Sequence, residues 1–374
     1  MKIPFFDYQN IYKRFKPEFN AIFEDVCSRG AYILQRDLDE FEIHLQEYTG
    51  IKHVLGVNDG TNAMIVGMNC IGFKETDEVI ISAHTYVATA AAIKLAGAKP
   101  ICADIDDHGM LSADSVKDVL TQNTKAIMPT QLNGRCCDMK KIIQIAEDNN
   151  LVLMEDSAQG LGAKHNEIHA GGFGKFGTLS FYPAKLIGCF GDGGAILTND
   201  SDLFEKAKMY RDHGRDESGI VQGLGTNSRL DNLQAAFLAL RLKHFEEDIS
   251  RRRQIAQFYS EILSKSNIFK LPEIQDGTNG NFNTFQNYEI EVKDRDNFKN
   301  FLSDHNIGSL IQWGGYSIID IQGFEDTKSD NIHYDRTNKF FEECIMLPMH
   351  MGITDDQLNY MEKILTKYIN EYTN

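Results

Sequence analysis

Short apolar runs alternate with segments of helical periodicity through about the first two thirds of this 374-residue chain. Apolar side chains recur at helical spacing at residues 15–27 and 38–48. The short apolar runs that follow predict β-strands, at residues 53–57, 78–82, 99–104, 125–130 and 151–156. Because short strands that alternate with helices are typical of a largely parallel sheet covered on both faces, the pattern predicts an α/β fold.

The pattern changes near residue 248. An amphipathic helix is predicted over residues 230–245 and continues towards residue 253. The elements predicted beyond it are a strand and two helices, at residues 287–292, 295–305 and 354–372. We therefore expect a large α/β domain at residues 1–248 and a small C-terminal α+β domain at residues 249–374.

One lysine stands out by its surroundings. Lys185 lies in residues 179–194, among Ser180, aromatic residues and several glycines. An ammonium group in partly apolar, tightly turned surroundings loses hydration, which favours its neutral, nucleophilic form. Such a lysine can form a Schiff base with an aldehyde. Most lysines are solvated surface charges, so this interpretation depends on the neighbouring motifs.

A phosphate-binding turn is predicted after the strand at residues 53–57. Gly60, Thr61 and Asn62 stand between this strand and an apolar helix. Backbone N–H groups and the positive end of a helix dipole would face an anion there. The same residues also suit an ordinary turn with an N-cap, so the motif alone does not decide.

Three polar side chains follow the carboxyl ends of predicted strands, where ligands bind in open α/β sheets: Tyr86, Gln131 and Asp156. A carboxylate at the depth of Asp156 needs a cationic or hydrogen-bonding partner. A protonated pyridine nitrogen would satisfy it, and so would the start of the next helix. Ser180 is placed to donate its hydroxyl to a phosphate.

The overall charge narrows the classes of partner. The net charge of −16 disfavours binding to DNA or RNA. The first residues lack the apolar region of a signal peptide, and no apolar run reaches membrane-spanning length, so a cytoplasmic protein without a membrane partner is expected. The seven cysteines form no CxxC pair, which predicts reduced thiols and no metal site.

Several motifs together resemble a known family. In chain order they are Gly60-Thr61-Asn62-Ala63, Glu155-Asp156-Ser157-Ala158-Gln159, Ser180-Phe181 with Lys185, Asn227-Ser228-Arg229 and Leu347-Pro348-Met349-His350. They resemble the DegT/DnrJ/StrS family of sugar aminotransferases that depend on pyridoxal 5'-phosphate (PLP), within the aspartate aminotransferase superfamily. The resemblance covers nearly the whole chain. It implies the fold-type I architecture, with a mostly parallel mixed sheet between helices and a small C-terminal domain.

The resemblance also implies roles around the cofactor ring. Lys185 is implied as the catalytic lysine that forms the Schiff base with PLP and later carries the proton. Asp156 would pair with the pyridine nitrogen and keep it protonated, so that the ring can accept electrons. Gln159 would hold the phenolic oxygen of the ring, and Tyr86 would stack on its face.

For the cofactor phosphate, the resemblance implies contacts from two subunits. Gly60, Thr61, Asn62 and Ser180 would bind it from one subunit. Asn227 would reach it from the partner, so the expected active unit is a homodimer with shared active sites.

Substrate contacts are less well defined by the motifs. Arg229 is a candidate because a guanidinium matches the phosphate oxygens of a nucleotide, although a surface ion pair would equally explain it. Gln131 and Tyr316 are further candidates, and for Tyr316 packing is the alternative. The chain also departs from the family pattern: Gln131 replaces a common histidine, Asp192 a common glutamate and Gln35 a usual glycine.

The resemblance implies an aminotransferase that moves an amino group from L-glutamate to C3 or C4 of a nucleotide-linked keto-deoxysugar, in amino-sugar biosynthesis for glycans or lipopolysaccharide. Relatives that remove a sugar hydroxyl carry histidine in place of Lys185, so this lysine favours transamination. The alternatives are an aminotransferase of a keto-cyclitol or another ketone, and a non-catalytic PLP-binding regulator. An oxidoreductase of the Rossmann type is disfavoured because no GxGxxG opens the first βα unit.

Overall fold

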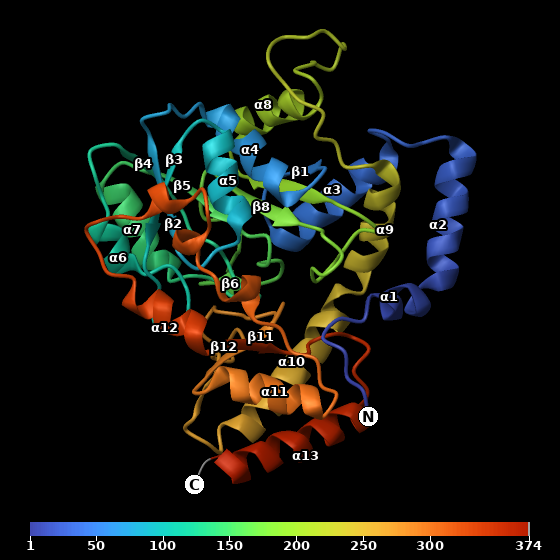
Figure 1. Ribbon diagram of the computed structural model, residues 1–374. Coiled ribbons are helices and arrows are strands. Elements are labelled where there is room, and N and C mark those ends of the chain that lie inside the picture. Colours follow the sequence, from blue (N-terminus) through green and yellow to red (C-terminus); the bar gives the residue numbers. More distant parts are fainter. Residues whose placement is uncertain (373–374) are drawn as a thin grey trace.

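A seven-stranded sheet forms the centre of the larger part of the molecule (Figure 1), in a computed structural model that describes residues 1–372. Its order is β1-β9-β8-β5-β4-β2-β3. The strands are β1 (His53–Val57), β2 (Glu78–Ser82), β3 (Lys99–Ala103), β4 (Thr124–Met128), β5 (Val152–Asp156), β8 (Phe176–Ser180) and β9 (Gly194–Thr198). Only β9 among them runs antiparallel to its neighbours. The predicted α/β fold with a mostly parallel sheet is confirmed.

Helices cover both faces of this sheet, as its buried strands require. One face packs against α4 (Gly60–Ile71), α5 (Val87–Leu95) and α8 (Ser201–Arg211). The other packs against α3 (Arg36–Thr49), α6 (Ala113–Asp118), α7 (Met139–Asp148) and α9 (Asn232–Lys243). Two N-terminal helices, α1 (Tyr8–Arg14) and α2 (Lys16–Arg29), lie outside them, where α2 contacts α9. A small hairpin consists of β6 (Lys164–His165) and β7 (Ile168–His169).

A second, antiparallel sheet lies below the first in Figure 1. Its strands are β10 (Phe269–Lys270), β11 (Tyr288–Val292) and β12 (Cys344–Leu347). Its core is shared with α10 (Phe245–Leu263), α11 (Arg295–Asp304) and α13 (Asp355–Tyr372), and Ile3 joins it from the N-terminus. The remaining elements are α12 (Asp335–Glu343) and 3-10 turns at Gln312–Gly315, Ile318–Asp320 and Glu325–Thr327.

The predicted helix over residues 230–253 is two helices. α9 ends at Lys243 and α10 begins at Phe245. The proposed domain boundary at residue 248 falls in the first turn of α10, where Ile249 still packs against the core of α3 and α9, while Ile255 belongs to the C-terminal core. The division into two domains stays a prediction.

Within residues 1–372, none of the helices combines the length and apolarity that crossing a membrane would need. Over the same residues, no group of three or more His, Cys, Asp and Glu side chains is arranged to hold a metal ion.

Candidate active site

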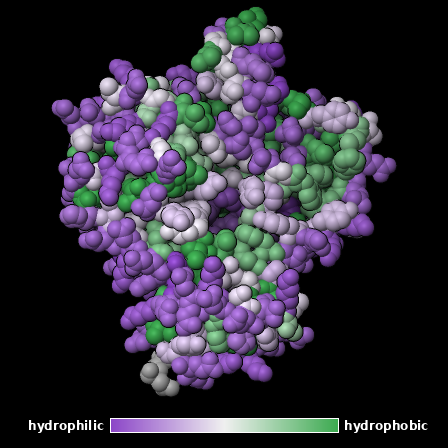
Figure 2. Space-filling view, viewed as in Figure 1, coloured by the Kyte–Doolittle hydropathy of each residue, from purple (hydrophilic) through white to green (hydrophobic). Residues whose placement is uncertain are grey.

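A cavity of about 670 Å³ opens at the carboxyl ends of the large sheet's parallel strands. Figure 2 shows this face of the molecule hollowed near its centre. Most of the residues predicted to bind a cofactor line this cavity, namely Gly60, Thr61, Asn62, Tyr86, Asp156, Gln159, Ser180 and Lys185. The fold brings them together because each follows or ends a strand, or begins a helix, at the same edge of the sheet.

Lys185 lies in a turn that a glutamine from the C-terminal half holds in place. The backbone N–H of Lys185 donates to the Tyr182 carbonyl at 2.8 Å. Gln286 brackets the lysine, because its Oε1 accepts from the N–H of Leu186 and its Nε2 donates to the carbonyl of Ala184, both at 2.8 Å. The position of the Lys185 side chain at the cavity wall is therefore set by both parts of the chain.

The ammonium group of Lys185 is destabilised. Loss of hydration lowers its pKa to about 8, and the negative charge of Asp156 opposes part of this shift. A lysine with a pKa near 8 has a substantial neutral fraction at neutral to mildly alkaline pH. It is therefore suited to attack an aldehyde and to carry a proton.

Asp156 ends β5 and is buried, with hydrogen bonds that orient its carboxylate. Thr89 Oγ1 donates to Oδ2 at 2.6 Å, and the N–H of Ala158 donates to Oδ1 at 3.1 Å. Thr89 is in turn bonded to Thr85, and Thr85 to Thr130, each at 2.7 Å. These neutral donors fix the carboxylate without neutralising its charge, and each carboxylate oxygen retains a further lone pair for a cationic ligand group.

The start of α4 forms an anion cradle beside Ser180. The Asp59 carboxylate caps the helix by accepting from the N–H of Asn62 at 2.7 Å, whereas the N–H groups of Gly60 and Thr61, in the first turn, have no intrahelical acceptor. A side chain at Gly60 would be crowded, because its Cβ would lie 3.0 Å from the Cβ of Ser180. Gly194 is more tightly constrained, since its Cβ would lie 2.4 Å from the carbonyl carbon of Asp59.

Gln159 and Tyr86 complete the wall. The Oε1 of Gln159 accepts from the backbone N–H of Asn133 at 2.9 Å, so its Nε2 is the donor left for a ligand. Tyr86 precedes α5 and half of its surface is exposed (53%), although it lines the cavity. An exposed aromatic ring in this position suits stacking on a planar ligand.

These donors and charges fit PLP. The helix start with Ser180 suits its phosphate, Asp156 suits a protonated ring nitrogen, the Nε2 of Gln159 suits the ring oxygen, and the lysine of lowered pKa suits its aldehyde. The fit rests on the donor set and on a cradle at Gly60 that a side chain would obstruct.

Four predicted residues do not line the cavity of this single chain. Asn227 is exposed, and Arg229 is paired with Asp212 at 2.7 Å. Gln131 is fully buried and donates to Glu155 at 2.8 Å, which favours packing over substrate contact. Tyr316 is 61% exposed outside the cavity wall.

Other lining residues were not predicted from the sequence. Phe5 and Phe6 come from the N-terminal segment, and Gln286 and Asn287 from the segment directly before β11. The one sequence signal for a site at these residues is weak: Gln286 and Asn287 are a polar pair directly before the apolar strand β11. Trp313, in the 3-10 turn at Gln312–Gly315, also lines the wall.

Comparison with known proteins gives a consistent result. The model of the DegT/DnrJ/EryC1/StrS aminotransferase family matches residues 13–366. A dTDP-3-amino-3,6-dideoxy-alpha-D-galactopyranose transaminase of Aneurinibacillus thermoaerophilus is 36% identical, over 83% of this chain and 85% of its own. A pleiotropic regulatory protein of Geobacillus stearothermophilus is 32% identical, over 98% of this chain and 99% of its own.

A solved structure extends this similarity to three dimensions. The structure of ntda from Bacillus subtilis with bound cofactor PMP superimposes with a TM-score of 0.89. It shares 26% sequence identity, and the match covers 99% of this chain and 85% of that one. The fold-type I architecture and the expected PLP-type cofactor are thereby confirmed.

Proposed function

Because the chain belongs to the DegT/DnrJ/EryC1/StrS family of PLP-dependent aminotransferases acting on nucleotide sugars, we propose that it transfers an amino group from L-glutamate to C3 or C4 of a nucleotide-linked keto-deoxysugar. The observation that supports this most is the cavity that unites Lys185, Asp156 and the start of α4. The pathway would be one that makes amino sugars.

When bound, PLP supplies an aldehyde that condenses with amines and a ring that accepts electrons. Lys185 would bind the aldehyde through Nζ. Once the amine of the donor has displaced it from the aldehyde carbon, the free, neutral Nζ would remove a proton from the donor carbon that bears the amino group and deliver it to that former aldehyde carbon. Asp156 would hold a proton at the pyridine nitrogen, and its hydrogen bonds with Thr89 and Ala158 would keep the carboxylate in place.

The other lining residues would orient the cofactor. The N–H groups of Gly60 and Thr61, together with Asn62 and the hydroxyl of Ser180, would bind the phosphate. Gln159 would donate to the ring oxygen. We propose these contacts on the basis of the donor set alone.

We also propose a homodimer whose subunits share each site. The loop between α8 and α9 projects from the body (Figure 1), and its apolar side chains are exposed at Ile220, Val221 and Leu224. Figure 2 shows apolar atoms at the tip of this projection. Burial of these side chains against a second copy would remove apolar surface from water. Asn227 lies in the same loop, outside the cavity of its own chain.

Mixing two inactive variants tests the shared site. Lys185→Ala and Asn227→Ala subunits, refolded together in equal amounts, are expected to recover about a quarter of wild-type activity, because half of the dimers would then hold one intact site of two. The measurement is turnover before and after mixing. Activity of the mixture equal to the mean of the separate variants would show that Asn227 acts within its own chain.

The acceptor is identified by a half-reaction. The pyridoxamine form of the enzyme, presented with a panel of nucleotide-linked 3-keto and 4-keto sugars, is expected to lose its amino group to one class of them, and absorbance reports the conversion. Conversion only with a free keto-cyclitol would replace the proposed substrate.

The regulatory alternative has its own support in the Geobacillus stearothermophilus relative, which is described as a regulatory protein. It predicts that the chain binds PLP but does not turn over with any donor and acceptor. Reaction of the bound cofactor with L-glutamate would count against it, because a pure sensor has no need of Lys185 as a proton carrier.

A further inference from the structure

Asn133 has an unusual backbone conformation beside the cavity. It follows β4, only 2% of its surface is exposed, and its φ of 58° lies in the left-handed region that residues other than glycine seldom adopt. Asparagine enters this region more readily than other residues with a side chain, and surrounding contacts hold it there.

The side chain of Asn133 supplies those contacts. Its Nδ2 donates to Glu289 Oε2 at 2.6 Å, and its Oδ1 accepts from Asn287 Nδ2 at 2.7 Å. Asn287 directly precedes β11 and Glu289 lies in it, so both belong to the C-terminal part of the chain. Because one end of the amide donates and the other accepts, the two bonds also fix which way the amide faces.

The backbone of the same residue holds Gln159. Its N–H donates to Oε1 of Gln159, and the next residue, Gly134, donates its N–H to the Gln159 carbonyl at 3.0 Å. Only glycine fits at position 134, since a Cβ there would lie 2.6 Å from the backbone nitrogen of Phe285. With its Oε1 engaged, Gln159 presents only its Nε2 to the cavity.

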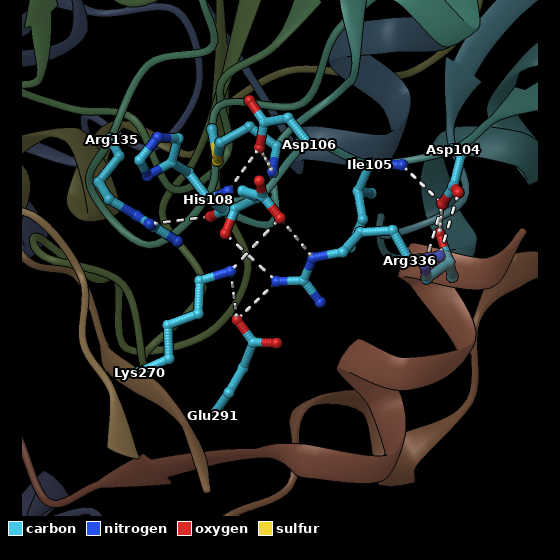
Figure 3. Close-up of polar contacts among 11 residues, drawn as sticks. Asp104, Ile105, Asp106, His108, Arg135, Lys270, Glu291 and Arg336 are labelled. Carbon is cyan, nitrogen blue, oxygen red and sulfur yellow. Dashed lines mark hydrogen bonds and ion pairs between the residues drawn. The ribbon is translucent and has the colours of Figure 1, made fainter. Parts of the chain in front are cut away.

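Among the described residues, Glu289 has fewer side-chain partners than Glu291, the other carboxylate of β11. Figure 3 shows Glu291 paired with Arg336 and Lys270, at 2.6 Å and 3.4 Å. The guanidinium of Arg135 in the same view is directed to the His108 carbonyl, at 3.1 Å.

For Glu289, by contrast, the structure over residues 1–372 gives one hydrogen bond, the one from Asn133, and its Oε1 is buried without a partner. Burial raises the pKa of Glu289 to about 7, while Arg135 and the Asn133 bond oppose the shift. The Asn133 amide is therefore the group that satisfies this buried carboxyl.

From this geometry we propose that Asn133 is a positioning residue: its side chain, anchored to β11 through Glu289 and Asn287, fixes the backbone N–H that turns the Nε2 of Gln159 towards the cofactor. The proposal rests on the proposed function, because it assigns Nε2 to the ring oxygen. It also joins the C-terminal sheet to the cofactor ring through a chain of three hydrogen-bonded residues.

The test is a double-mutant cycle of Asn133→Gly and Gln159→Leu in the PLP-loaded protein. Glycine keeps the N–H and accepts the left-handed backbone, so Asn133→Gly removes only the side-chain anchor. A donor to an anionic oxygen favours its deprotonated form, so loosening it should raise the pH midpoint of the visible absorption change of bound PLP. Asn133→Gly alone should raise that midpoint and weaken PLP binding about three- to tenfold. In a protein that already carries Gln159→Leu, adding Asn133→Gly should change neither quantity further.

Glu289→Ala is a second variant with the same expected shift, and Glu289→Gln, which keeps an oxygen to accept from Asn133, should shift the midpoint less. Thermal unfolding of the PLP-free proteins reports any general loss of stability separately. An unchanged midpoint in Asn133→Gly and Glu289→Ala, or an equal shift with and without Gln159, would overturn the proposal. Absence of a visible PLP band in the unsubstituted protein would instead overturn the proposed function itself.

Discussion

Replacement of Lys185 by alanine is expected to lower turnover at least about 10³-fold, because the variant loses both the amine that binds the aldehyde and the base that moves the proton. PLP should still bind through the cradle at Gly60 and Ser180, although more weakly. The measurements are steady-state turnover and an absorbance titration with PLP.

A surface lysine gives the matched control for this substitution. Lys293 is exposed and does not line the cavity, so Lys293→Ala should retain wild-type turnover. If Lys185→Ala retained full turnover, Lys185 would have no chemical role in the reaction. Loss of turnover in both variants would point to a general effect of removing a lysine.

Asp156→Asn is expected to reduce turnover about 10²- to 10³-fold, while PLP binding changes less. Asparagine preserves the shape of the side chain but carries no charge, so a protonated ring nitrogen loses its counter-ion and the ring accepts electrons less readily. Turnover and PLP affinity, measured on the same preparation, separate these two effects.

Thr89→Val provides the comparison for Asp156. It removes the hydroxyl that donates to Oδ2 and leaves the carboxylate charge in place. We expect a loss of less than about tenfold, since one neutral hydrogen bond is removed. If Asp156→Asn had no larger effect than Thr89→Val, orientation of the side chain rather than its charge would be the important property.

Much of the cofactor wall could be predicted from the sequence because its residues belong to local motifs. Gly60, Asp156 and Ser180 each stand at the end of a strand or the start of a helix, and parallel strands place these ends at one edge of the sheet. Local motifs of this 374-residue chain therefore predict most of the cavity wall around Lys185.

Contacts between distant segments could not be predicted in this way. Phe5, Gln286 and Asn287 reach the wall only through packing of the N-terminus and of β11 against the large sheet. Gln131 follows a strand as expected, but its side chain is directed into the core, where Glu155 accepts from it. Strand order gives the edge at which a residue lies, whereas the direction of its side chain depends on neighbours far away in the sequence.

The break between α9 and α10 was also missed. The apolar periodicity runs on through His244, without the glycine or proline that would indicate a helix end. The buried ion pair of Arg241 with Asp248, at 2.7 Å, spans the break and is formed by side chains that a periodic pattern treats as polar surface.

The central claim is that Lys185 is the residue that binds PLP. Borohydride reduction of the PLP-loaded protein, followed by digestion and mass spectrometry, tests it directly, because reduction makes the bond between lysine and cofactor permanent. The account predicts one modified peptide, with the added mass at Lys185, and none in Lys185→Ala. Modification at a different lysine, or no modification of the unsubstituted protein, would contradict it.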